Sequence, residues 1–177
     1  MRKLGITFGF LLCVLAVSYA GAQTSAPDWQ DWGFLMGEWT GSGSGDPGQG
    51  AGGFTFKTGL QGRVVERTNY AEYPATKERP AYRHDDLMVI YQEAAKGPVR
   101  AIYFDNEGHV IHYAVEINPS SRTAIFLSEA ANGAPRYRLS YIGKTPDLVN
   151  IKFEVAPADK PGQFQTYIEA TAKRAVQ

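Results

Sequence analysis

Short segments of alternating apolar and polar residues recur along the chain after residue 37, and turn-forming residues separate each from the next. Such alternation predicts strands that bury one face and expose the other. Ten ranges fit this pattern: 38–44, 52–58, 62–72, 82–93, 99–106, 109–118, 122–129, 135–143, 148–156 and 163–174. Because no stretch after residue 41 has a convincing helical pattern, we predict an all-β fold rather than a parallel α/β sheet.

The turns between these strands favour an antiparallel up-and-down barrel. Asn106-Glu107-Gly108 has the chemistry of a tight hairpin, and clusters rich in Asn, Gly, Pro and Ser occupy residues 118–121, 132–135 and 157–162. One set of side chains on each strand then faces inward. On three strands the residues that share one face are Ile111, Tyr113, Val115 and Ile117; Tyr137, Leu139 and Tyr141; and Val149, Ile151, Phe153 and Val155. About ten strands leave room for an internal cavity.

The segment before the first strand is rich in aromatic residues. Trp29, Trp32, Phe34, Leu35 and Met36 fall at spacings that suit one or two helical turns, so we predict a short N-terminal helical plug at the base of the barrel. Seven glycines follow between residues 41 and 53. They indicate either sharp coiling of two strands at a barrel corner or a flexible loop at the barrel mouth.

Residues 1–22 form a predicted secretory signal peptide, which leaves residues 23–177 as the barrel domain. Arg2 and Lys3 precede an apolar run over residues 4–17, and Ala20-Gly21-Ala22 supplies the cleavage site. An uncleaved anchor is the alternative, but the run is too short to span a bilayer comfortably. We therefore expect a secreted or periplasmic protein, cleaved near Ala22 and not stably inserted in a membrane.

Composition excludes several kinds of function. Cys13 is the one cysteine of the sequence and lies in the leader, so the cleaved chain has no thiol for a disulfide, a nucleophile or a thiolate metal site. Removal of Arg2 and Lys3 leaves 16 of the 18 basic residues, against 18 acidic residues. With no long run of like charge, nothing predicts binding to a nucleic acid.

Residues 34–43 read Phe-Leu-Met-Gly-Glu-Trp-Thr-Gly-Ser-Gly. Their Leu-x-Gly-x-Trp-x-Gly-x-Gly pattern resembles the opening of calycin-like barrels, which include lipocalin-like and nitrobindin-like proteins, and of bacterial secreted proteins that share it. The resemblance implies that Trp39 packs across the closed end against Lys173 or Arg174 of the last strand. Nitrobindins bind haem through a histidine near the C-terminal end. The last histidine here is His112, so that ligand does not carry over.

The three histidines do not predict a metal site. His84 and Asp86 share a face of their strand, whereas His109 and His112 face opposite ways. A divalent cation needs three or more convergent ligands, and only His109 or His112 could join His84. We therefore assign His84 to a solvated strand end or a turn hydrogen bond, and we expect no metal and no cofactor.

Arginine and tyrosine side chains in mid-strand provide the better binding hypothesis. A buried arginine must be paired, and the carboxylate of an apolar ligand would pair it. The cavity candidates are Arg67, Tyr91, Tyr103, His112, Arg138 and Tyr141. The alternative for each is a packed tyrosine or an outward arginine paired with Glu66 or Glu154. For His112 the exterior is favoured, because the opposite face of its strand has the better apolar stripe.

These observations predict a secreted barrel that binds a small apolar or amphipathic molecule in its cavity, with no reaction implied. Three alternatives remain open: a haem-binding nitrobindin-like barrel, a small enzyme that uses the cavity, and an interaction module with a filled interior. An inward histidine or carboxylate with a strongly shifted pKa would favour the enzyme. A packed core with an exposed apolar patch would favour the module.

Overall fold

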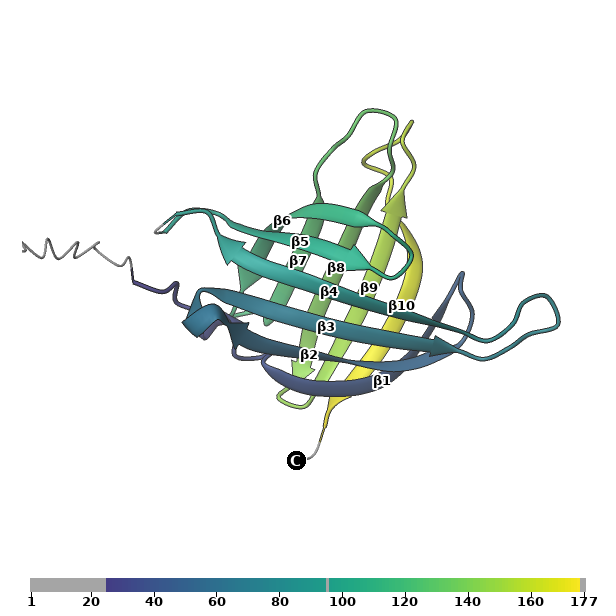
Figure 1. The fold of residues 1–177 in the computed structure, drawn as a ribbon, viewed down its shortest axis with the longest axis horizontal. Helices are drawn as coiled ribbons and strands as arrows, with labels where there is room; N and C mark the ends of the chain where they lie inside the picture. The colour runs from purple at the N-terminus through teal and green to yellow at the C-terminus, as the bar shows by residue number, and fades with distance from the viewer. Residues whose placement is uncertain (1–24, 95, 176–177) are drawn as a thin grey trace, which may run out of the picture.

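A computed structural model describes residues 25–94 and 96–175, and over these residues the chain forms a closed barrel of ten antiparallel strands (Figure 1). The strands are β1 (Gly37–Gly45), β2 (Gly50–Gly59), β3 (Val64–Tyr73), β4 (Tyr82–Gln92), β5 (Val99–Asp105), β6 (Val110–Asn118), β7 (Thr123–Ser128), β8 (Arg136–Thr145), β9 (Leu148–Ala156) and β10 (Gln165–Arg174). Strands that follow one another in sequence pair, and β10 pairs with β1 to close the barrel. The predicted all-β antiparallel barrel is confirmed, and each predicted strand end lies within two residues of the observed one.

The chain before β1 contains little helix in its described part. A 3₁₀ turn, η1 (Gln30–Trp32), precedes β1, and a second, η2 (Leu60–Gly62), joins β2 to β3. One such turn does not confirm the predicted helical plug. The predicted signal peptide, residues 1–22, lies outside the described residues. Within residues 25–94 and 96–175, no helix is long and apolar enough to cross a bilayer.

The connections between strands alternate between the two ends of the barrel (Figure 1). The β1–β2, β3–β4, β5–β6, β7–β8 and β9–β10 connections lie at one end, which we call the open end. The other four connections lie at the opposite, closed end. The β5–β6 turn is tight, and Gly108 within it has a φ of +93°, which side-chain-bearing residues rarely adopt.

Side chains alternate between interior and exterior as the strand pattern predicts. Tyr113, Tyr141 and Val149, one from each of the three sets that share a face, are buried. The remaining members of those sets pack against the buried core or line the interior. These three sets therefore face inward, and the predicted division of each strand into an inward and an outward face is observed.

Aromatic side chains fill the closed end. The Trp32 ring lies 6.3 Å from Phe56 and 6.0 Å from Phe126, centroid to centroid. Tyr141 meets Phe54 and Phe56 edge to face at 5.4 Å. Burial of one such side chain contributes roughly 1.5–3 kcal/mol, and edge-to-face pairs add to it. This half of the interior is core, so a ligand can enter only the other half.

Trp39 on β1 packs beside this core. Its indole stacks on Phe54 with centroids 5.9 Å apart, and its Nε1 donates to the Leu35 carbonyl oxygen at 2.9 Å. The Arg174 guanidinium lies 4.3 Å from the Trp39 ring centroid and also donates to the Phe34 carbonyl oxygen. The cation–π contact that the resemblance implies is present, with Arg174 as the partner and Lys173 exposed.

The glycines of β1 and β2 permit close approach of neighbouring strands. A Cβ atom at Gly41 would lie 2.2 Å from the Thr171 carbonyl oxygen, and one at Gly52 would lie 2.1 Å from that of Tyr70. Contacts this short are sterically forbidden, so these strands can coil tightly only with glycine there. The structure thus favours the coiling interpretation for these two positions. The missing side chains also leave space inside the barrel.

Candidate functional site

A cavity of about 500 Å³ occupies the interior toward the open end. Its apolar wall consists of Ile111 on β6, Leu139 on β8, and Ile151 and Phe153 on β9. Glycines of β1 and β2 line a further part of it. A volume of this size suits a small organic molecule.

The opposing wall, on β3, β4 and β5, is polar. At its deep end Arg67 Nη1 and Asp86 Oδ1 form an ion pair at 2.5 Å, and the two residues are 5% and 8% exposed. Burial works against the charged guanidinium, but the attraction of Asp86, together with smaller contributions from nearby tyrosines, outweighs it and raises the pKa of Arg67. Asn69 Nδ2 donates to the other Asp86 oxygen at 2.8 Å. The charge of Arg67 is therefore balanced within the protein.

His84 connects this ion pair to the rim of the cavity. Its Nε2 lies 3.3 Å from Asp86 Oδ2 and 3.0 Å from the Tyr103 hydroxyl oxygen, and its Nδ1 lies 2.9 Å from Glu107 Oε1. The hydrogen bond with Asp86, opposed by burial and reinforced by Glu107, raises the pKa of His84 to about 9. At neutral pH His84 is therefore an imidazolium with a carboxylate beside each ring nitrogen.

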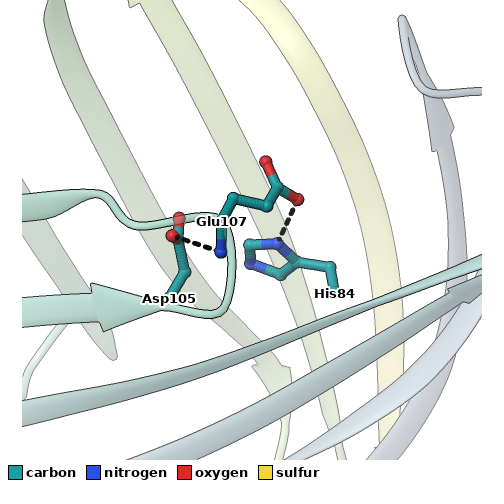
Figure 2. A group of neighbouring side chains, drawn as sticks. All are labelled: His84, Asp105 and Glu107. Atoms are coloured by element: carbon teal, nitrogen blue, oxygen red, sulfur yellow. Dashed lines mark hydrogen bonds and ion pairs between the residues drawn. The ribbon is translucent and has the colours of Figure 1, made fainter.

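The β5–β6 turn extends the network at the rim. Asp105 accepts a hydrogen bond from the Tyr103 hydroxyl at 3.1 Å and lies 2.8 Å from His109 Nδ1. Its Oδ1 accepts one from the backbone N–H of Glu107 at 3.0 Å, while Glu107 reaches back to His84 (Figure 2). Burial opposes the charged carboxylate, but the hydrogen bonds from His109 outweigh it and lower the pKa of Asp105.

His84, Asp105 and Glu107 form a group that could in principle bind a divalent cation (Figure 2). One ligand atom from each lies within 4.8 Å of the other two, and an imidazole with two carboxylates is a suitable donor set. However, the protonated ring of His84 already contacts Glu107, and Asp105 already accepts from Tyr103. A cation would have to displace the His84 proton. The hydrogen bonds of the cluster account for its arrangement.

Two buried polar atoms near the deep end, Arg67 Nε and the Tyr141 hydroxyl oxygen, make no hydrogen bond of regular geometry with the described residues and have almost no accessible surface. Tyr141 is 0% exposed, and its ring centroid lies 5.9 Å from Arg67 Cζ. Burial, partly offset by the Arg67 charge and by a loose hydrogen bond with that guanidinium, raises the pKa of Tyr141 to about 12. The hydroxyl therefore keeps its proton and can donate. Both residues line the cavity.

The six sequence-derived cavity candidates divide into two groups. Arg67, Tyr103 and Tyr141 line the cavity. Tyr91, His112 and Arg138 belong to the outward-facing sets of β4, β6 and β8, because their neighbours Ile90, Tyr113 and Leu139 are buried inside. The prediction that these three residues line the cavity is therefore corrected, because their side chains face outward.

Arg138 and His112 illustrate the two outward environments. Arg138 donates to both carboxylate oxygens of Glu154, at 2.6 and 2.9 Å, and its guanidinium lies 4.3 Å from the Phe164 ring centroid. This is the outward pairing with Glu154 that the sequence left open, although Glu154 itself is buried beneath its partners. His112 is exposed on the outer face of β6. The apolar stripe on the opposite face of that strand had predicted this orientation.

Sequence reasoning missed most of the polar wall. Asp86 and His84 were expected to share a face, and they do, but the strand end was interpreted as solvated rather than as part of an interior network. Asn69, Asp105 and Glu107 were not predicted at all. The signal that could have found them is the strand register, since Asn69, Asp86 and Asp105 stand side by side on β3, β4 and β5.

The raised pKa of His84 leads to a pH prediction. A group whose pKa is higher in the folded state than in the unfolded state stabilises the fold in its protonated form. For His84 this contribution is fully present below the unfolded pKa of 6.5 and is lost as the pH rises through about 9. We expect the free energy of unfolding to fall by up to about 3 kcal/mol across this interval. Urea unfolding followed by tryptophan fluorescence at a series of pH values measures it.

His84→Gln and His112→Gln form a matched pair for this measurement. His84→Gln should flatten the dependence, whereas His112→Gln, at an exposed position, should keep the wild-type slope. An unchanged slope in His84→Gln would contradict the assignment of the titrating group.

Comparison with known proteins yields likeness in fold only. No family model matches the sequence, and no curated protein matches it. The nitrobindin-like and lipocalin-like resemblance therefore has no support from sequence comparison and stays a prediction.

Solved structures with a similar barrel do exist. A designed fluorescence-activating β-barrel is 10% identical over 80% of this chain and 94% of its own, with a TM-score of 0.41. An S-type phycobiliprotein lyase from Guillardia theta is 10% identical over 81% of this chain and 90% of its own, with a TM-score of 0.49. A redesigned β-barrel covers 86% of this chain and 100% of its own at 10% identity, with a TM-score of 0.39. Identity and TM-scores this low carry no inference about function.

Proposed function

We propose that this protein binds a small, largely apolar molecule non-covalently in the cavity of the barrel. The observation that carries the proposal is the cavity itself, about 500 Å³ in volume and lined by aliphatic and aromatic side chains with a few convergent polar groups. This combination is typical of small-molecule sites. A filled-core interaction module, by contrast, would have no such space.

The division of the cavity into two walls favours an amphipathic ligand. Ile111, Leu139 and Ile151 would hold the apolar body, while the polar end would face the wall that contains Arg67 and Tyr103. The expectation that a ligand carboxylate pairs Arg67 is not retained, because Asp86 already does so. We also propose that binding occurs outside the cytoplasm, in line with the predicted cleavage near Ala22, and without a cofactor.

Native mass spectrometry of protein purified from its own host tests the proposal. We expect a non-covalent adduct that is lost on denaturation. After extraction, titration with N-phenyl-1-naphthylamine should give saturable fluorescence with a dissociation constant in the range of about 1–50 μM, as is ordinary for an apolar probe in such a site. No adduct and no saturable binding would overturn the proposal.

Added haem serves as a separate arm of the same experiment. Two histidines line the cavity. We expect the Soret band to stay unshifted, because His84 contacts carboxylates through both ring nitrogens and His109 lies at the exposed rim with its Nδ1 on Asp105. A shifted Soret band would favour the haem-binding alternative.

A second candidate, an enzyme that uses the same cavity, has one observation in its favour. His84 lies beside Asp86 and Tyr103 in the interior, with its pKa raised to about 9. An imidazolium can donate a proton to a bound carbonyl but cannot accept one at neutral pH. The imidazolium would protonate the carbonyl oxygen of 2-acetylnaphthalene while a water molecule removes a proton from its methyl group, so entry of solvent deuterium into that methyl group, followed by proton NMR, tests this role. Binding alone predicts exchange no faster than in buffer or in His84→Gln.

A further inference from the structure

We infer that the ligand carries a planar aromatic ring system, which is held at the open end of the cavity between aromatic side chains of two opposite walls. This inference rests on the proposed function and names the chemical class of the ligand. It follows from the positions of five aromatic side chains that line the cavity toward its open end, and we call them the mouth rings: Tyr73, Tyr82, Tyr137, Phe153 and Tyr167.

One wall of the mouth carries a stacked pair of tyrosines. Tyr73 ends β3 and Tyr82 begins β4, so the two flank the β3–β4 connection at the open end. Their ring centroids are 4.7 Å apart, and their planes differ by 11°. The Arg79 guanidinium lies 4.6 Å from the Tyr82 centroid and donates to the Pro47 carbonyl oxygen. These contacts fix the pair before a ligand enters, and such preorganisation favours binding.

The opposite wall carries a second parallel pair, Tyr137 and Phe153. Their centroids are 5.8 Å apart, and their planes differ by 8°. The strands that hold them, β8 and β9, lie five steps around the ten-stranded barrel from β3 and β4, respectively. Tyr137 is near the start of β8 and Phe153 near the end of β9, and both of these strand ends are at the open end. Two flat aromatic pairs therefore stand on opposite sides of the mouth.

A β-bulge in β10 adds Tyr167 to the mouth rings. The register of β10 on β9 shifts between Thr166 and Ile168, and a bulge redirects the side chain of its extra residue. Because Ile168 lines the cavity, its neighbour Tyr167 would face outward from a regular strand. Instead, the Tyr167 ring meets Phe153 edge to face at 6.0 Å and lines the cavity. It stays 36% exposed, so part of its surface is available to a ligand.

Rings from different sides of the mouth lie close to one another. Burial, and after it the Tyr82 and Tyr167 hydroxyls, raise the pKa of Tyr73, which places the Tyr167 hydroxyl of β10 near that of Tyr73 on β3. A planar ring system can offer one face to each wall and gains aromatic contacts there beyond the burial of area. A saturated ring system of the same skeleton is thicker and has no π face.

Three alcohols with eleven carbon atoms each separate aromatic recognition from burial of apolar surface: 2-naphthalenemethanol, its decahydro derivative and 1-undecanol. Each is titrated against the protein loaded with N-phenyl-1-naphthylamine, and displacement gives its association constant. Division by the octanol–water partition coefficient of the compound accounts for burial. We expect this normalised affinity to be about tenfold higher for 2-naphthalenemethanol than for either saturated alcohol, the effect of one or two aromatic contacts.

Phe153→Leu and Phe104→Leu are the matched variants. Phe153 contacts both Tyr137 and Tyr167, so Phe153→Leu should reduce the normalised preference at least about threefold. Phe104 is 41% exposed on the outer face of β5, and Phe104→Leu should keep the wild-type preference. Tyr167→Leu repeats the test at a partly exposed position where the fold is not at risk, and it should also reduce the preference at least about threefold.

The outcomes distinguish this inference from the function on which it rests. Equal normalised affinities for the three alcohols, a higher value for a saturated one, or a preference as large in Phe153→Leu or Tyr167→Leu as in Phe104→Leu would overturn the inference while leaving small-molecule binding intact. Saturable binding of N-phenyl-1-naphthylamine without displacement by any alcohol would also overturn it. No binding of any of the four compounds would overturn the proposed function itself.

Discussion

Replacement of Asp86 by alanine is expected to lower the free energy of unfolding by about 3–5 kcal/mol. The reason is that Arg67 is 5% exposed and Asp86 supplies its counter-charge at 2.5 Å. Without Asp86 the guanidinium remains charged in a site from which water is largely excluded. His84 and Asn69 lose a hydrogen-bond partner at the same time. Urea unfolding at pH 7 measures the change.

Two controls separate this effect from the removal of any acidic residue. Glu66 pairs with Lys57 at 3.6 Å on the exterior, where Lys57 is 63% exposed, so Glu66→Ala should cost no more than about 1 kcal/mol. The double variant Arg67→Met with Asp86→Leu removes both charges and should recover much of the loss. A loss for Asp86→Ala below about 1 kcal/mol, or no recovery in the double variant, would show that the buried charge is not the cause.

The fold was predictable because its determinants are local. Alternation of apolar and polar residues specifies which segments become strands, and turn residues such as Gly108 specify where the chain reverses. Closure of the barrel follows when each strand pairs with its sequence neighbour. Trp39 and Arg174 stand directly opposite each other in the β1–β10 register, so their contact follows once the first strand pairs with the last.

The site was less predictable because a cavity weakens the rule that identifies the inner face. On β6 the outer face carries Val110 and Ala114, so hydrophobicity alone left the direction of His112 open. On β4 the adjacent Asp85 and Asp86 are alike in sequence, yet Asp85 pairs with Arg83 outside and Asp86 with Arg67 inside. The alternation of side chains along a strand places His84 on the same face as Asp86, but it does not show which face is inward. That depends on partners on β3 and β5, which only the register brings together.

Replacement of Ile151 by tryptophan is expected to lower the affinity for N-phenyl-1-naphthylamine by about 100-fold, which corresponds to about 2.7 kcal/mol. Ile151 lines the apolar wall of the cavity and stands opposite Tyr141 on β8 and Ala170 on β10. An indole at this position would occupy the cavity space beside Tyr141 that the apolar body of a ligand needs. Fluorescence titration of the variant measures the effect.

The same substitution on the outer wall provides the control. Ile125 is an outward residue of β7, between the buried Ala124 and Phe126, and Ile125→Trp should leave the affinity within about twofold of the wild type. Both variants should unfold within about 2 kcal/mol of the wild type, since Ile151→Trp fills existing space rather than displacing packed atoms. If Ile151→Trp remains folded and binds the compound as tightly as Ile125→Trp does, the binding site is not this cavity.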